Sequence, residues 1–216
     1  MPADVRPPSE RLYTALRSAI MHGQFAPEQA LKPQEIAQNG GVSLAVAREA
    51  LLRLVGEGMA IRLPNRGFAV PAAGAERWQQ IAEARAVTEP AVLRLSVARG
   101  GVDWEVRVRS AHHRLARTPV WTTDSEHYSD EWAEAHRQFH RALLEGCGND
   151  VLLDTFDRMW TASELARRWA TSLTPDRDGV AEHAALEAAA LDRDADLAAE
   201  LLGRHVMRTA HTLTGD

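Results

Sequence analysis

The sequence contains one cysteine in 216 residues, and it has neither a long apolar run nor an apolar start. A single cysteine, Cys147, excludes a disulfide framework within the chain and fits a reducing compartment. No stretch approaches the roughly 18 apolar residues of a membrane helix, and the opening MPADVRPPSE lacks the apolar core of a secretory signal peptide. We therefore expect a soluble, cytoplasmic protein with no membrane partner.

Positive charge is also scarce, because 25 lysines and arginines stand against 30 acidic residues, for a formal net charge of −5. Such a balance excludes a protein that coats nucleic acid by bulk positive charge. The charge is unevenly spread: residues 1–74 hold eight basic and six acidic side chains, whereas the remainder holds 17 and 24. Only the first third has the charge to meet a phosphate backbone.

The length predicts two unequal domains, since it exceeds the roughly 100–200 residues typical of one domain. Small residues at 71–74 indicate a linker at 72–75 between a first domain at 1–71 and a second at 76–216. Beyond the linker, helical periodicity interrupted by turn-forming residues predicts six helices, over 76–99, 103–117, 126–145, 149–172, 178–191 and 194–213. We expect this second domain to be an all-α bundle.

The first domain combines helices with a hairpin. Apolar residues at helical spacing predict a helix over 9–22, and Asn39–Gly41 divides the next segment into a short helix at 33–38 and a longer one that starts near Ser43. Two short strand-like runs then surround the turn formers at 64–67, which predicts a β-hairpin. The fold class is therefore mainly α, with a winged helix-turn-helix followed by a six-helix bundle.

The second helix of a helix-turn-helix enters the major groove of double-stranded DNA, where residues near its start reach bases and phosphates. Ser43, Arg48 and Arg53 are available for such contacts in this chain. The hairpin tip at 65–67 would act as a wing, with Arg66 as its cation and Gly67 allowing close approach of the backbone. The alternative is that both arginines of the helix only pair with acidic neighbours on a solvated face.

In this order, the helix, the helix-turn-helix and the wing resemble the winged-helix domain of the GntR family of bacterial transcription regulators, over about residues 11–70. The most specific segments are Arg48–Leu51, which matches the family's VREAL element, and Arg66–Val70 in the wing. The resemblance implies DNA contacts by Arg48 first, and then by Ser43, Arg53, Arg66 and Gly67. This chain departs from the family pattern at Leu44–Val46, where Arg-Thr-Pro is usual, and at Gln34, which replaces a frequent cation, so we expect an altered operator sequence and affinity.

Histidines recur at helical spacing in the second domain. His136 and His140 lie four residues apart and so share one helix face. His183 and His205 flank a turn near 193–194 at similar distances, which makes them neighbours in a pair of antiparallel helices. Histidines also occur on helix surfaces and in satisfied interiors, but four buried imidazoles need a common partner, and a divalent metal is one that serves all of them.

Arg85 is a further polar residue on a mostly apolar helix face. A permanently charged guanidinium in such a place needs an anion. Glu89, four residues later, would supply one at the edge of the helix. The other interpretation is a two-bond clamp on the carboxylate of a small ligand, whose remaining oxygens the metal would hold.

The second domain resembles the FCD ligand-binding domain of the FadR subfamily of GntR regulators, over about residues 76–213. The matching segments are Arg85–Pro90, the FHRALLE run from Phe139, Glu182–His183 and the last helix with His205. The resemblance implies three metal ligands, His140, His183 and His205. The family usually has a fourth ligand, an aspartate, where this chain has His136. An imidazole there either ligates too, which favours zinc or nickel, or leaves a three-histidine site that is open to water or effector.

These features together predict a homodimeric transcription regulator, more often a repressor in this family, which binds a pseudo-palindromic operator and responds to a small carboxylate effector. One alternative is a regulator for which the metal itself is the signal. A metalloenzyme is disfavoured, because the segment His136–His140 lacks the glutamate that follows the first histidine in zinc proteases, and no Ser–His–Asp arrangement is apparent.

Overall fold

The computed structural model describes residues 6–64, 66–72, 74–122, 129–169 and 179–214. The chain divides into two compact units, Met1–Gly74 and Ala75–Asp216, so that the division falls inside the linker expected at 72–75. Within the described ranges, no helix has both the length and the apolar character needed to span a membrane.

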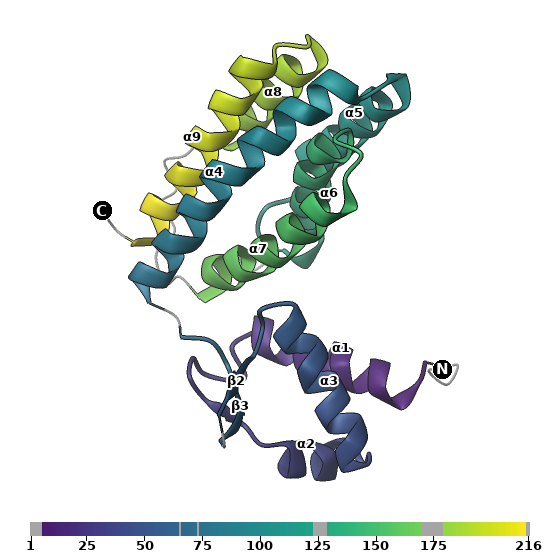
Figure 1. Cartoon of the computed structure of the whole chain (residues 1–216), viewed down its shortest axis with the longest axis vertical. Helices are drawn as coiled ribbons and strands as arrows, with labels where there is room; N and C mark the ends of the chain where they lie inside the picture. The colour runs from purple at the N-terminus through teal and green to yellow at the C-terminus, as the bar shows by residue number, and fades with distance from the viewer. Residues whose placement is uncertain (1–5, 65, 73, 123–128, 170–178, 215–216) are drawn as a thin grey trace. The chain divides into compact units, whose positions relative to one another are not determined.

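The first unit is a helical domain with a small sheet (Figure 1). Its elements are α1 (Pro8–Met21), β1 (Ala30–Leu31), α2 (Pro33–Gly40), α3 (Leu44–Gly56), β2 (Ile61–Leu63) and β3 (Gly67–Ala69). The expected hairpin is present as β2 and β3, but β1 adds a third antiparallel strand in the order β1-β3-β2, with Leu31 and Arg62 on either side of Phe68. The sequence did not predict β1, because two residues are too short to display alternation.

The helix-turn-helix forms where the sequence provides a sharp turn and a cap. Gly41 ends α2 in the left-handed conformation, at φ 60°, which a residue without a side chain adopts at little cost. Ser43 then begins α3, because its side chain accepts a hydrogen bond from the Val46 N–H at 3.3 Å. Leu51 and Leu54 are fully buried and fix α3 to the core of this unit.

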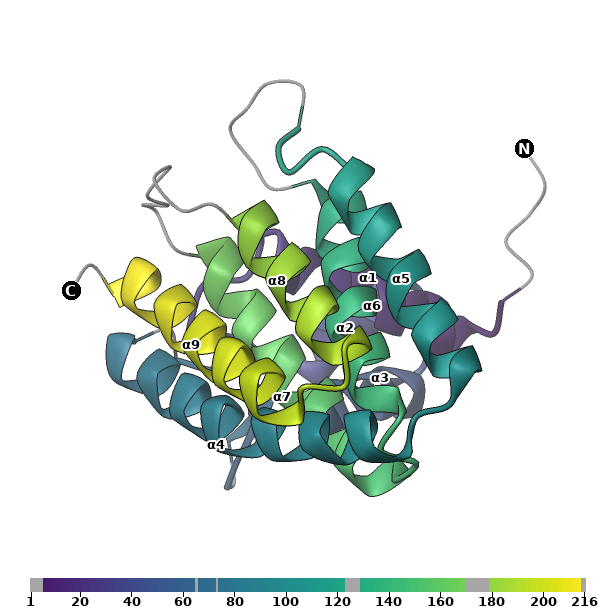
Figure 2. The same ribbon diagram turned by 90° about the horizontal axis from the view of Figure 1, so that it is seen from above.

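The second unit is a bundle of long helices. They are α4 (Ala75–Arg99), α5 (Val102–Arg117), α6 (Asp130–Glu145), α7 (Asp150–Trp169), α8 (Gly179–Leu191) and α9 (Ala195–Thr214). Helix α9 lies alongside α4 in both views (Figures 1 and 2). The core is built from large buried side chains, which include Trp104, Phe139, Leu143, Phe156, Trp160, Leu186 and Leu202.

The six helices described between Ala75 and Thr214 confirm the predicted all-α bundle, and the mainly helical fold class is confirmed with them. Helix α6 starts at Asp130 rather than at 126, because Ser129 caps it by accepting a hydrogen bond from the Trp132 N–H at 3.3 Å. Positions 126–128, 170–172 and 178, which were also predicted as helix, lie outside the described residues.

Candidate metal centre and nucleic-acid interface

The start of α3 presents the predicted DNA contacts to solvent. Ser43 is exposed, although its side chain is already engaged in capping the helix. Arg48 is exposed one turn further on, and within the described part of the chain no side chain pairs with its guanidinium. The alternative of a local ion pair is therefore not seen at Arg48, and its DNA contact stays a prediction.

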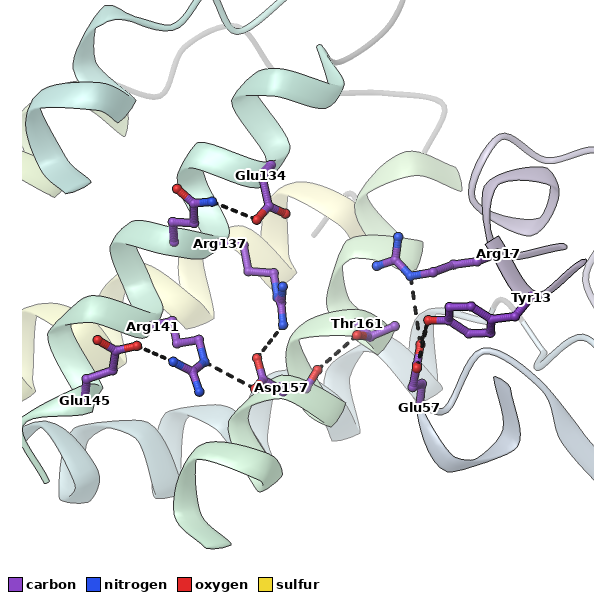
Figure 3. Close-up of polar contacts among 10 residues, drawn as sticks. Tyr13, Arg17, Glu57, Glu134, Arg137, Arg141, Glu145, Asp157 and Thr161 are labelled. Atoms are coloured by element: carbon purple, nitrogen blue, oxygen red, sulfur yellow. Dashed lines mark hydrogen bonds and ion pairs between the residues drawn. The ribbon is translucent and has the colours of Figure 1, made fainter. Parts of the chain in front are cut away.

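Arg53 is also exposed, but it differs from Arg48 because its guanidinium contacts neighbouring side chains. It lies 3.6 Å from Glu57 and 3.7 Å from the centre of the Tyr13 ring. The Tyr13 hydroxyl donates to Glu57 at 2.6 Å, and Arg17 lies 3.9 Å from the same carboxylate (Figure 3). Burial, followed by the bond to Glu57, raises the pKa of Tyr13 to about 12. The local pair that was the alternative interpretation is thus present at Arg53.

The wing is exposed at its tip. Arg66 is exposed, and its backbone N–H closes the turn on the Leu63 carbonyl at 3.1 Å. Gly67 has φ 87°, a backbone conformation that favours glycine. Asn65 lies outside the described residues. Arg62 is a further exposed cation, on β2, which sequence reasoning missed although its strand was predicted.

Three helices of the second unit bring the four predicted histidines together. Helix α6 contributes His136 and His140, α8 contributes His183, and α9 contributes His205. One ring nitrogen from each lies within 4.8 Å of the others, and all four side chains are buried. Arg193 adopts φ 64° in the turn between α8 and α9. This turn places His183 and His205 side by side, as their similar distances from it in the sequence predicted.

His140 is the most deeply buried of the four, at 1% exposure, and neither of its ring nitrogens has a hydrogen-bond partner in the described structure. A buried polar atom without a partner costs about 1–3 kcal/mol. Burial, reinforced by the imidazoles of His205 and His183, holds the pKa of His140 well below the usual 6.5. Burial and His140 lower the pKa of His136 in the same way. These rings are neutral, the form in which imidazole binds a metal, so the donor set fits a zinc or nickel ion.

Two of the rings have hydrogen-bond partners outside the cluster, here called outer partners, which orient them. Nδ1 of His205 lies 2.8 Å from Glu182, whose other oxygen accepts from Arg208 at 3.1 Å. Nδ1 of His136 lies 3.4 Å from Arg167. Across the cluster, Nε2 of His136 lies 3.1 Å from Nε2 of His183.

Arg85 is buried beside this cluster, with 4% of its surface exposed. It forms two hydrogen bonds with Glu89, at 2.5 and 3.2 Å, and its guanidinium lies 4.8 Å from the Trp160 ring. The expected alternative of a pair with Glu89 is thus present, but in the interior rather than at the helix edge. Arg85 also lines a cleft between α4, α7 and α9, together with Trp78, Ile81, Ala82, Ser163, Val206, Thr209 and Ala210.

Helix α7 supplies site residues that sequence reasoning missed. The Trp160 ring lies 5.0 Å from each of the His136 and His140 rings, and Glu164 pairs with Arg167 at 2.5 Å in the interior. Their signal was present in the spacing, since positions 160, 164 and 167 share one helix face.

Helices α6 and α7 are joined by charged side chains as well as by core packing. Asp157 of α7 accepts hydrogen bonds from Arg137 at 2.7 Å and from Arg141 at 3.3 Å, both on α6 (Figure 3). Arg141 also pairs with Glu145 of its own helix. These contacts hold the helix that carries His136 against the helix that carries Trp160.

Comparison with known proteins assigns both units. Residues 8–70 match the bacterial regulatory proteins of the gntR family, and residues 80–208 match the FCD domain. The chain is 30% identical over 200 residues to the HTH-type transcriptional repressor GlaR of Escherichia coli K12, with 90% of each chain covered. It is 33% identical over 206 residues to the uncharacterized HTH-type transcriptional regulator BphR of Paraburkholderia xenovorans LB400, over 94% of this chain and 84% of that one.

Solved structures agree on the fold. E. coli McbR/YncC is similar with a TM-score of 0.74 at 19% identity, over 98% of this chain and 99% of that one. A putative transcriptional regulator GntR from Rhodococcus sp. RHA1 gives a TM-score of 0.71 at 21% identity, over 96% and 97% of the two chains. The family matches and the relatives confirm the resemblance seen in the sequence: this chain belongs to the GntR family of DNA-binding transcription regulators, with a helix-turn-helix domain followed by an FCD domain.

Proposed function

We propose that this protein is a homodimeric repressor that a small organic acid, bound together with a divalent metal in the FCD domain, releases from its operator. The repressor assignment rests on the relative GlaR, which is named a transcriptional repressor. The observation that carries the ligand response is the cluster of four buried histidines, two of which are held neutral. A regulatory role, exerted in the cytoplasm, is proposed rather than a catalytic one.

DNA binding is assigned to α3 and the wing. Arg48 extends into solvent without a competing carboxylate in the described structure, and Arg66 lies at the tip of the wing. Leu44 and Ala45 are exposed at the start of α3, and apolar side chains in the major groove favour contact with thymine methyl groups. Two copies of this domain would read two half-sites of a pseudo-palindrome, because a twofold protein matches a twofold site.

Metal binding is assigned to the histidine cluster. His140, His183 and His205 provide nitrogen donors in the interior, with His136 beside them. A zinc or nickel ion in this place would act as a Lewis acid that attracts a carboxylate oxygen. Since the cluster itself contains no carboxylate, the bound ion would keep its positive charge and favour an anionic effector.

The effector would share Arg85 with Glu89. Both oxygens of Glu89 bond to the guanidinium, so a second carboxylate must either displace Glu89 or bind at the cleft side of Arg85. By linkage, the effector weakens operator binding only as far as it prefers the conformation that does not bind DNA. A preference of about 2–3 kcal/mol would change operator affinity roughly 30- to 150-fold.

The proposal is tested by elemental analysis of protein purified without a histidine tag. We expect about one divalent ion per chain, and its loss from the His140→Ala protein, because that ring has no other partner. His113→Ala is a matched control, since His113 is exposed on α5. Metal-free wild-type protein that also fails to take up zinc or nickel would overturn the metal assignment.

A second candidate is a regulator for which the metal alone is the signal. The buried pair of Arg85 with Glu89 favours this candidate, because it leaves that guanidinium already neutralised. Operator release by zinc or nickel in the absence of any organic acid would support it. Release that requires both the metal and an acid would support the effector function.

A further inference from the structure

The outer partners of His205 and His136 have opposite hydrogen-bonding character. His205 faces a carboxylate, that of Glu182, whereas His136 faces a guanidinium, that of Arg167. A neutral imidazole carries one proton, so the partner of one ring nitrogen decides what the other nitrogen offers. If the proposed metal site is present, these partners determine which rings can bind the ion.

At His205 the outer partner can only accept. Glu182 receives a hydrogen bond from Arg208 on one oxygen and lies 2.8 Å from Nδ1 of His205 with the other. In the neutral ring, Nδ1 must therefore carry the proton, which leaves the lone pair on Nε2. Glu182 thus prepares His205 as a metal ligand, in the carboxylate–histidine arrangement common around bound metals.

At His136 the outer partner can only donate, because a guanidinium has N–H groups and no acceptor. Nδ1, 3.4 Å from Arg167, must then be the acceptor, and the proton resides on Nε2. That N–H is directed at Nε2 of His183, 3.1 Å away. For His136 to bind a metal through Nε2, its proton would have to move to Nδ1, where it would face the N–H groups of Arg167.

Arg167 is held firmly in this position. Its side chain is 5% exposed, it pairs with Glu164 at 2.5 Å, and its guanidinium lies 5.6 Å from the Trp160 ring. Moving a buried guanidinium away from its carboxylate is costly, because a buried ion pair would be broken. The tautomer of His136 is therefore built into the packing of α6 against α7.

We propose that His140, His183 and His205 alone bind the metal, and that His136 is a hydrogen-bond donor beside it, kept in that tautomer by Arg167. Once Nε2 of His183 is engaged by a metal, the N–H of His136 needs another acceptor. An oxygen of an anion at the ion's open position satisfies it, whereas an amine or a cation does not. His136 is then a specificity residue that selects carboxylate or other oxygen-rich ligands. An aspartate at this position could only accept.

The tautomer can be measured directly. Long-range proton–nitrogen NMR spectra of the full-length, 15N-histidine-labelled protein report which nitrogen of His136 carries the proton, with and without zinc. We expect the proton on Nε2 in both states, with His205 protonated on Nδ1. A His136 ring that is protonated on Nδ1 in the zinc-loaded protein would overturn the proposal.

Metal binding by variants tests it independently. The His136→Gln protein keeps an N–H near the position of Nε2, and we expect it to bind one zinc per chain with an affinity within about tenfold of wild type. His136→Ala should retain the same stoichiometry, whereas His140→Ala should lose stoichiometric zinc. Loss of zinc from both His136 variants, with folding intact by circular dichroism, would contradict the three-histidine assignment. Wild-type protein without any metal would instead contradict the proposed function.

The role of Arg167 has its own readout. In the Arg167→Met protein, His136 is free to reverse its tautomer and become a fourth nitrogen ligand in place of solvent, so the visible absorption bands of the cobalt-substituted protein should shift relative to those of cobalt-substituted wild type. An unchanged cobalt spectrum in Arg167→Met would contradict a role for Arg167 in keeping His136 off the metal.

Discussion

The two units of this regulator place their functional side chains in opposite environments. In the helix-turn-helix unit, Arg48 and Arg66 are exposed, and their charges are screened by water until DNA arrives. In the FCD unit, Arg85, Arg167 and the histidine cluster are buried among apolar side chains. The difference shows that changes at the exposed contacts should alter binding with little cost in stability, whereas changes at the buried site should alter both.

The strongest test of this contrast is to break a buried pair. Glu89→Ala leaves the Arg85 guanidinium buried without its carboxylate, and we expect a loss of about 3–5 kcal/mol in the free energy of unfolding. Urea denaturation measures it. Glu83→Ala is the matched control, because Glu83 is exposed on the same helix. Equal stability of the two variants would mean that the buried pair is not needed to compensate the charge of Arg85.

The exposed contacts of the helix-turn-helix unit should give a smaller effect, and on DNA affinity rather than on stability. Arg48→Ala should weaken binding to an operator selected from random duplex DNA by about 1–3 kcal/mol, with the melting temperature unchanged. Arg53→Ala should cost less affinity and some stability, because its guanidinium already contacts Glu57 and Tyr13. Fluorescence anisotropy titrations compare the two. A larger loss of affinity at Arg53 than at Arg48 would reverse their assigned roles.

The smallest expected effect concerns the polar cluster of Tyr13, Arg17 and Glu57 in the helix-turn-helix unit (Figure 3). Tyr13→Phe removes a hydrogen bond to Glu57 and should lower the free energy of unfolding by about 1 kcal/mol. Because the folded pKa is about 12, raised from 10.0, this contribution is present below pH 10.0 and is lost as the pH rises towards 12. An ultraviolet titration of the phenolate measures that pKa. A measured pKa near 10 would mean that burial and Glu57 do not stabilise the protonated form of Tyr13.

Much of the FCD site could be predicted from the sequence, because helical geometry is regular. The four-residue spacing of His136 and His140, and the similar distances of His183 and His205 from one turn, determine which rings share a face and a height. The outer partners could not be predicted. Glu89 and a ligand carboxylate fit Arg85 equally well until burial of both side chains is known.

Other features escaped prediction for similar physical reasons. The spacing of Trp160, Glu164 and Arg167 shows that they share one face of α7, but whether this face meets the histidines depends on how the helices pack. In the first unit, the opposite situations of Arg48 and Arg53 on a single helix depend on where α1 places Tyr13. In both cases the outcome depends on how neighbouring elements pack together.

The central claim is that the histidine cluster controls DNA binding. Its most direct test is the operator affinity of the wild-type and His140→Ala proteins, each measured in the presence of zinc and titrated with acetate, lactate, succinate, citrate and benzoate. We predict that at least one acid weakens wild-type binding by roughly 30- to 150-fold and that none does so for the variant. Identical affinities for the two proteins under every condition, with and without zinc, would contradict the account.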